Sequence, residues 1–168
     1  SLVVVHGDVS PDSILVSREG IPRLYDFGMA RAEDSQASSE QSGALRRSGH
    51  YAPPERIHGA PLGPAADLWS LGVVLYELLT GESLFQGRSL LELLDAVASA
   101  DLGEAFARVE RLDAEIGAWL RRVLERLPEA RLGDARRLAV ALESISQRLA
   151  PLSESSTRRL ADLVEALD

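Results

Sequence analysis

Two carboxylates, Asp8 and Asp26, are the side chains of this sequence best placed to do chemistry. Each follows a short apolar run and stands in a turn, and between them lie an Ile-Leu-Val run and a Glu-Gly turn. This pattern predicts strands over 14–17 and 22–25 that pair as a β-hairpin, with both carboxylates on loop ends. A carboxylate on such a loop can act as a general base or a metal ligand, whereas an aspartate in a turn can also be purely structural. The local pattern leaves both readings open.

A polar segment separates the hairpin from the rest of the chain. Residues 31–48 are small and polar, with five serines between positions 35 and 48, which predicts a long loop. We favour a solvated linker here, with phosphoacceptor serines as the alternative. The sequence Tyr51-Ala52-Pro53-Pro54-Glu55 ends the segment, and its prolines forbid a helix through that point.

Beyond this point the pattern is helical. Residues 65–80 predict a helix that is apolar on nearly all sides, and such a helix must be central and buried. Gly81 suits its C-terminal cap, and Ser89 with Glu92 forms a capping box for the next helix. Further helices are predicted over 89–98, 113–125 and 134–149, and a last short one after Pro151.

The composition restricts the class of protein. The chain has 168 residues, 45% of them hydrophobic and 26% charged, as expected for one soluble globular domain. A net charge of -8 argues against a nucleic-acid partner, and no run approaches the roughly 18–20 apolar residues of a membrane span. Without cysteine there is no disulfide framework and no thiolate zinc site. No signal peptide is visible, so we expect a cytoplasmic location.

Four motifs resemble, in order and spacing, those of the C-terminal lobe of a bacterial serine/threonine protein kinase domain. They are the catalytic loop at 6–16, the magnesium motif Asp26-Phe27-Gly28, the Ala-Pro-Glu box at 51–55 and the opening of the central helix at 67–72. The resemblance implies a mainly α (α+β) fold, a helical bundle around a buried central helix. It places a small β-hairpin on the catalytic-loop side, and the family's N-terminal lobe is absent.

The resemblance assigns a scaffold role to five residues. His6 and Phe27 belong to an apolar stack that rests on the central helix. Asp67 binds the backbone of the catalytic loop, and Glu55 pairs with Arg131. Burial of such charged groups is tolerable only with partners of this kind.

The sequence departs from the family at the residues that carry the chemistry. Asp8 keeps the place of the catalytic base and Asp26 the place of the magnesium ligand. Ser13 stands where the family has an asparagine that binds the second magnesium ion, and a hydroxyl is a poorer ligand than an amide oxygen. Ser10 replaces the lysine that touches the transferred phosphate. Gly7 replaces the arginine that reads phosphorylation of the activation loop.

The groups that hold ATP in the family have no counterpart in this sequence. We expect a fragment of a longer protein that lacks the glycine-rich loop of the family. The strand lysine is also missing, because all 18 Lys and Arg residues of this sequence are arginine. Phosphoryl transfer depends on positioning and on charge neutralisation by such groups. We therefore expect no cofactor and no catalysis in this fragment, and MgATP only as a cofactor of the full-length protein.

We favour a pseudokinase module over 1–150 that binds or scaffolds proteins without efficient phosphotransfer, followed by an amphipathic helical extension over 151–168. In the alternative, the full-length protein is an active kinase that transfers phosphate from ATP to protein serine or threonine, with Asp8 as base. A third, structural class is oligomerisation through the tail helix, whose apolar stripe is Leu160, Leu163, Val164 and Leu167. The expected partner is a protein or a second copy of the chain, with no nucleic acid and no membrane span.

Overall fold

The structure is a computed structural model that describes residues 4–27, 49–132, 135–148 and 153–166. The predicted serine-rich loop and the glycine of the magnesium motif lie outside these residues. The elements run in the order η1 (Pro11–Ser13), β1 (Ile14–Val16), β2 (Pro22–Leu24), α2 (Pro54–Ile57), α3 (Pro64–Thr80), α4 (Leu90–Ser99), α5 (Gly103–Leu112), α6 (Ala114–Val123), η3 (Pro128–Ala130), α7 (Ala135–Arg148) and α8 (Ser153–Glu165). This confirms the predicted mainly helical fold with a small hairpin.

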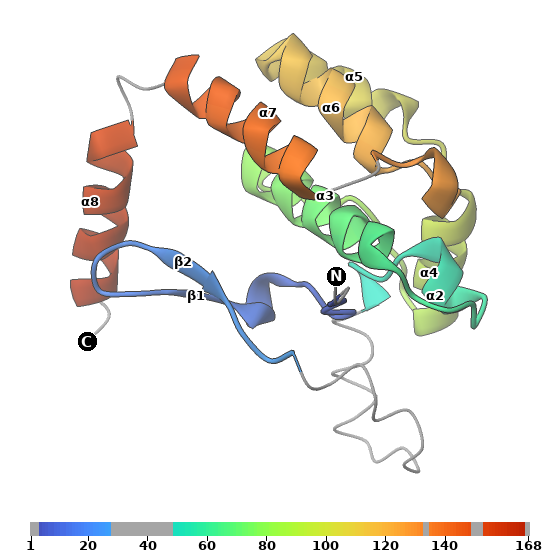
Figure 1. Ribbon diagram of the computed structural model, residues 1–168. Coiled ribbons are helices and arrows are strands. Elements are labelled where there is room, and N and C mark those ends of the chain that lie inside the picture. The colour runs from blue at the N-terminus through green and yellow to red at the C-terminus, as the bar shows by residue number, and fades with distance from the viewer. Residues whose placement is uncertain (1–3, 28–48, 133–134, 149–152, 167–168) are drawn as a thin grey trace.

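The hairpin forms where the sequence predicts it. β1 and β2 pair antiparallel, with Ile14 opposite Leu24 and Val16 opposite Pro22. Gly20 closes the turn with φ 74°, and its amide donates to the Ser17 carbonyl at 2.9 Å. Because a left-handed residue is strained for most side chains, glycine suits this position. The hairpin extends away from the helical part, and α8 lies beside its tip (Figure 1).

α3 is the centre of the helical part, with α5, α6 and α7 around it (Figure 1). It begins with Pro64 at its first position and ends at Gly81, whose φ of 70° gives the left-handed cap predicted from the sequence. Its Trp69 is fully buried and stacks on Phe85 with ring centroids 5.9 Å apart.

The prediction that α3 is buried on nearly all sides is wrong for its last turn, where Leu78 is 78% exposed. Gly72 faces α6, because a Cβ added there would lie 2.8 Å from Cγ1 of Val123. Leu78 comes six residues later and is therefore turned about 120° away from that face. The helix is central along one side and open to solvent on another.

α5 is a helix that the sequence analysis did not predict. It ends at Leu112, and the carboxylate of the next residue, Asp113, caps α6 by accepting from the amides of Glu115 and Ile116 at 2.9 and 3.1 Å. The two helices pack at Gly117, where a Cβ would lie 2.9 Å from the Cα of Glu110. Their apolar faces join the core around α3, which includes Leu93, Val97, Val109, Leu120, Val123, Leu138 and Ile145.

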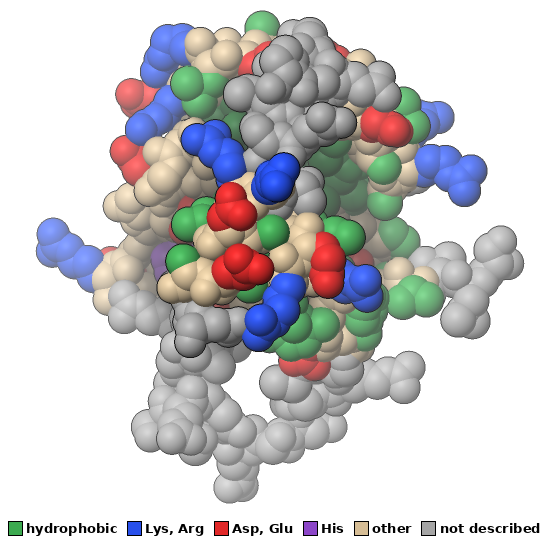
Figure 2. Space-filling view, turned by 90° about the vertical axis from the view of Figure 1, so that its left-hand side faces the viewer, with side chains coloured by type: hydrophobic (Ala, Val, Ile, Leu, Met, Phe, Trp, Pro, Cys, Tyr) green, Lys and Arg blue, Asp and Glu red, His purple; other side chains and the backbone are tan. Residues whose placement is uncertain are grey.

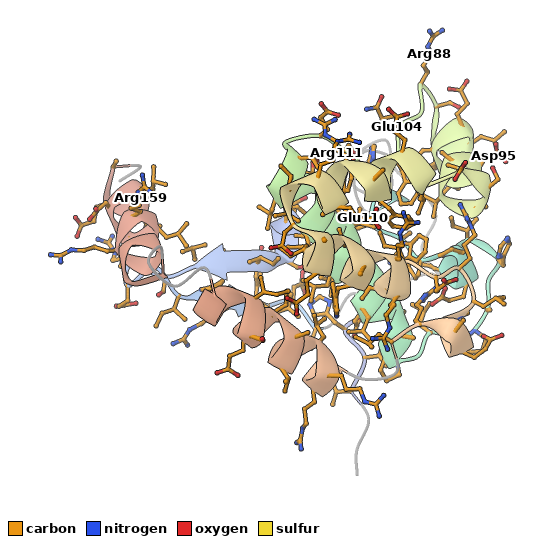
Figure 3. The ribbon with its side chains drawn as sticks, turned by 90° about the horizontal axis from the view of Figure 1, so that it is seen from above. Arg88, Asp95, Glu104, Glu110, Arg111 and Arg159 are labelled. Carbon is orange, nitrogen blue, oxygen red and sulfur yellow. The ribbon has the colours of Figure 1, made fainter. Side chains whose placement is uncertain are left out.

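The outer surface of the helices is charged. Seen from above, Arg88 and Arg111 point away from the core, and Arg159 stands on α8 (Figure 3). On the face that includes the hairpin tip and α8, arginines and acidic side chains lie close together with apolar side chains between them (Figure 2). Within the part of the chain that the structure describes, no helix combines the length and the apolar character needed to cross a membrane.

Candidate functional site

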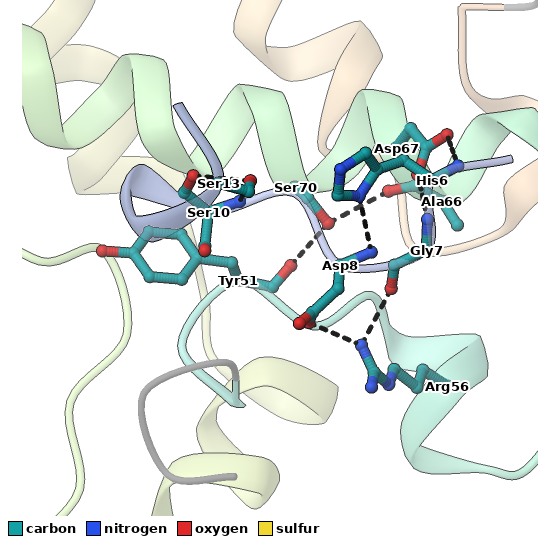
Figure 4. A network of polar contacts seen from close by, with 10 residues as sticks. All are labelled: His6, Gly7, Asp8, Ser10, Ser13, Tyr51, Arg56, Ala66, Asp67 and Ser70. Carbon is teal, nitrogen blue, oxygen red and sulfur yellow. Dashed lines mark hydrogen bonds and ion pairs between the residues drawn. The ribbon is translucent and has the colours of Figure 1, made fainter. Parts of the chain in front are cut away.

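The loop that carries Asp8 is fixed to α3 by one carboxylate. Oδ2 of Asp67 accepts from the amide of His6, and Oδ1 accepts from the amide of Gly7, both at 2.8 Å (Figure 4). Asp67 lies in the first turn of α3, where the helix dipole favours a negative charge. Gly7 has φ 77°, a backbone conformation that favours glycine. The structure thus brings Asp67 onto the loop backbone, the contact that the resemblance implies.

His6 links this loop to the segment after the hairpin. Its Nε2 lies 2.8 Å from the Tyr25 carbonyl, and its Nδ1 lies 3.3 Å from the amide of Asp8. A carbonyl only accepts and an amide only donates, so Nε2 carries the proton and Nδ1 accepts. The His6 ring is buried and lies 4.7 Å from the ring of Phe27, but Phe27 itself is 56% exposed. The structure brings the two rings together and leaves most of the Phe27 ring uncovered.

Asp8, the candidate base, is held by an arginine that the sequence analysis did not select. Nη1 of Arg56 lies 3.0 Å from Oδ1 of Asp8 and donates to the Gly7 carbonyl at 2.8 Å. The two side chains are 22% and 31% exposed, so the pair is only partly screened by water. Arg56 directly follows Glu55 in the chain, but no local pattern connects it with a residue 48 positions earlier.

Ser13 and Ser10 form a closed unit. The hydroxyl of Ser13 accepts from the amide of Ser10 and donates to the Ser10 carbonyl, both at 2.9 Å. Ser13 is 6% exposed and Ser10 is 8% exposed. The Ser13 hydroxyl therefore uses its only hydrogen and one of its two lone pairs in hydrogen bonds to the backbone within η1.

Asp26 has an unusual backbone conformation. Its φ is 66°, the only positive φ of a non-glycine residue in the described part of the chain, and its side chain is exposed. Residues held in this region are uncommon and are concentrated at functional sites. Across the described residues, no group of three or more His, Asp or Glu side chains is close enough to hold a metal ion. With Ser13 closed on the backbone, the described donor set does not fit the two-ligand magnesium site of the family.

A buried ion pair fixes the segment at 51–57 to the end of the core. The guanidinium of Arg131 binds both carboxylate oxygens of Glu55 at 2.6 Å, and the Arg131 side chain is 0% exposed. It also donates to three backbone carbonyls, those of Ala65, Glu125 and Arg126. The guanidinium thus makes five hydrogen bonds within the protein. Hydrogen bonds of this kind are needed to offset the cost of burying two charges. This is the pairing that the resemblance implies.

Tyr51 connects the same segment to α3. Its hydroxyl donates to Oε2 of Glu77 at 2.6 Å, and its carbonyl accepts from the Ser70 hydroxyl at 2.8 Å. Burial, followed by the hydrogen bond to the Glu77 carboxylate, raises the pKa of Tyr51 well above its usual range. Tyr51 and Glu77 line a cleft of about 310 Å³ together with Asp12 and His50.

Comparisons with known proteins agree with this geometry. The profile of the protein kinase domain matches residues 1–144. The serine/threonine-protein kinase PknL of Mycobacterium tuberculosis is 34% identical over 144 residues, which are 86% of this chain and 36% of PknL. The serine/threonine-protein kinase PknB of the same organism is 35% identical over 140 residues, 83% of this chain and 22% of PknB. The chain thus spans about a third or less of the length of these curated relatives.

Proposed function

Since this chain belongs to the protein kinase domain family, we propose that it is a pseudokinase module, which keeps the frame of the kinase fold and binds or scaffolds proteins without efficient phosphotransfer. The frame is the set of contacts around Asp67, His6 and the Glu55–Arg131 pair. The departures lie at the positions that bind metal and phosphate.

The observation that carries this proposal is the closed hydroxyl of Ser13. Mg²⁺ requires hard oxygen ligands in near-ideal octahedral geometry and gives up its water reluctantly. The Ser13 hydroxyl already makes two hydrogen bonds of 2.9 Å to the Ser10 backbone and is buried. To bind a metal ion it would have to leave both partners, and the amide of Ser10 would lose its acceptor.

The binding half of the proposal is supported by apolar surface near the site. Three large side chains of the hairpin, Leu15, Ile21 and Leu24, are 55%, 46% and 39% exposed. A groove of about 470 Å³ runs between the hairpin, α3 and α7, and apolar side chains such as Ile14 and Leu142 line it. Exposed apolar surface of this kind is typical of protein interaction sites.

The alternative, an active serine/threonine kinase in the full-length protein, is favoured by one specific observation. Asp8 and Asp26 keep the two carboxylates that the family uses, and Asp26 has the strained φ of 66°. The relatives are also named as serine/threonine-protein kinases.

Calorimetric binding of ATP to the full-length protein, with and without Mg²⁺, separates the two. We expect no Mg²⁺-dependent gain in affinity for the wild-type protein. Ser13→Asn restores the amide ligand, whereas Ser99→Asn on the exposed end of α4 serves as the matched control. Tight binding of MgATP by the wild-type protein, abolished by Asp26→Asn, would overturn the proposal in favour of the kinase. The mass of the chain in solution tests oligomerisation separately, because a dimer or larger species would support the structural class.

A further inference from the structure

The contact of Arg56 with Asp8 is not explained by the scaffold of the fold. Two other ion pairs have a clear place in the fold: Glu55 and Arg131 close the core, and Arg108 on α5 binds Glu82 in the exposed segment after α3. The Arg56 guanidinium instead ends on the carboxylate of the candidate base, with Nη1 3.0 Å from Oδ1 (Figure 4).

Both sides of this contact are held by rigid anchors. On the loop side, Asp67 binds the amides of His6 and Gly7 at 2.8 Å, so the backbone before Asp8 cannot withdraw. On the other side, Arg56 follows Glu55, whose carboxylate is tied to the buried Arg131. The backbones at 8 and 56 are therefore fixed relative to each other, and only the two side chains can turn.

Nη1 of Arg56 is placed by two acceptors at once. It donates to the Gly7 carbonyl at 2.8 Å and to Oδ1 of Asp8 at 3.0 Å. The hydrogen bond to the Gly7 carbonyl holds the guanidinium beside the carboxylate. Because the guanidinium is planar and carries several N–H donors, a second hydrogen bond costs it little further conformational entropy. A positive charge therefore stands beside Oδ1, one of the two oxygens of this carboxylate that can accept a proton or bind a cation.

We propose that Arg56 is a latch on Asp8, which covers the carboxylate by an intramolecular ion pair, so that a hydroxyl or a cation reaches Oδ1 only after the guanidinium turns away. Arg56 is thus a positioning residue for Asp8. The proposal holds whether or not the protein transfers phosphate, since it concerns only the access to this carboxylate.

The expected size of the effect follows from the exposure of the pair. A partly exposed ion pair with one supporting hydrogen bond shifts the equilibrium between closed and open by roughly fivefold. The Asp8 carboxylate should therefore be accessible for only about one sixth of the time, and removal of the guanidinium should raise its accessibility by about sixfold.

Carboxyl labelling of the 168-residue chain tests the latch without any assay of phosphate transfer. The chain is treated with a water-soluble carbodiimide and glycine ethyl ester, and the rate of modification at each carboxylate is read by peptide mass spectrometry. In Arg56→Gln we expect the rate at Asp8 to rise by about sixfold, with the rate at Asp12, in the adjoining η1, unchanged. Arg108→Gln is the matched control, which should expose Glu82 and leave Asp8 unaffected.

Three results would overturn the latch. One is an unchanged rate at Asp8 in Arg56→Gln. Another is an equal rise at Asp8 and Asp12, which would mean that Arg56 only maintains the fold of the loop. The third concerns Arg56→Lys, which keeps the charge and serves as the milder variant if Arg56→Gln does not fold. This variant should retain part of the protection of Asp8. If Asp8 in the folded Arg56→Lys protein were labelled as fast as in the denatured chain, the result would contradict the ion pair.

Discussion

Replacement of Arg131 by methionine should destabilise the protein more than the loss of an exposed ion pair, because this arginine neutralises a buried carboxylate. The substitution removes five hydrogen bonds, two to Glu55 and three to backbone carbonyls. It also removes the stacking of the guanidinium on Trp69, whose ring centroid lies 5.0 Å from Cζ. Glu55, only 7% exposed, is left without its counter-ion.

Breaking such a buried pair from one side costs about 3–5 kcal/mol in free energy of unfolding. For a chain of this size each kcal/mol lowers the Tm by roughly 2–4 °C, so we expect a fall of about 6–20 °C. Replacing both partners, as in Glu55→Leu with Arg131→Met, leaves no buried charge and should cost less than the sum of the two single changes, by about 2 kcal/mol. Arg131→Lys keeps the charge and should lie between the single variant and the wild type.

Urea unfolding followed by far-ultraviolet circular dichroism measures these differences. The matched control is Arg108→Met, which breaks a similarly bidentate pair with Glu82 whose side chains are 40% and 54% exposed. It should cost far less than Arg131→Met, because water screens both charges. Equal losses for Arg131→Met and Arg108→Met would refute the reasoning from burial.

Two further predictions concern stability. The pKa of Tyr51 is raised above its unfolded value of 10.0, so the folded protein keeps this proton at pH values where the unfolded chain loses it. The free energy of unfolding should therefore fall above about pH 10, by at most about 1.4 kcal/mol per pH unit. Tyr51→Phe should lose this part of the pH dependence, which urea titrations at pH values from 8 to 11 would detect, and an identical pH profile would contradict it. Gly117→Ala should cost about 1–3 kcal/mol, because its Cβ would lie 2.9 Å from the Glu110 backbone, while Gly63→Ala, with nothing within 4 Å, should cost under about 1 kcal/mol. Equal thermal shifts for the two glycine variants would refute the close approach of α5 and α6.

Much of the fold follows from local pattern. The hairpin is specified by two short apolar runs and a turn glycine, and α3 by its apolar run between Pro64 and Gly81. The capping box at Ser89 forms in part. The Ser89 hydroxyl accepts from the amide of Glu92 at 3.2 Å, but the Glu92 carboxylate binds the amide of Arg88 instead of that of Ser89. The sequence motif therefore predicts correctly where the helix begins. It does not predict which amide the Glu92 side chain binds.

α5 was missed although its signal is present. Leu102, Phe106 and Val109 have helical spacing, but charged residues dominate the segment and Gly103 opens it. Its stability comes from packing on α6, which a single segment does not reveal. The exposure of Leu78 was missed for a related reason, because the hydrophobicity of a helix does not say which of its faces a neighbour covers.

The residues of the candidate site were predictable, and so were the contacts of Asp67 and of Glu55 with Arg131, which the resemblance implies; the contacts of Ser13 and Arg56 were not. The motifs select Asp8, Ser13, Asp26 and Asp67, and the structure brings Asp67 onto the loop backbone. The Ser13 hydroxyl binds the backbone of Ser10, three residues earlier in the chain. This contact could be predicted only if the turn between the two residues were already known. Arg56 lies far from Asp8 in the sequence, so only the fold reveals their contact.

We propose that the protein does not transfer phosphate efficiently. The most direct test of this proposal is the rate at which the full-length protein, with Mg²⁺ and labelled ATP, transfers phosphate to itself or to a protein acceptor. We expect a rate for the wild-type protein no higher than that of Asp8→Asn. A wild-type rate well above that of Asp8→Asn would contradict it and would identify Asp8 as the base of an active kinase.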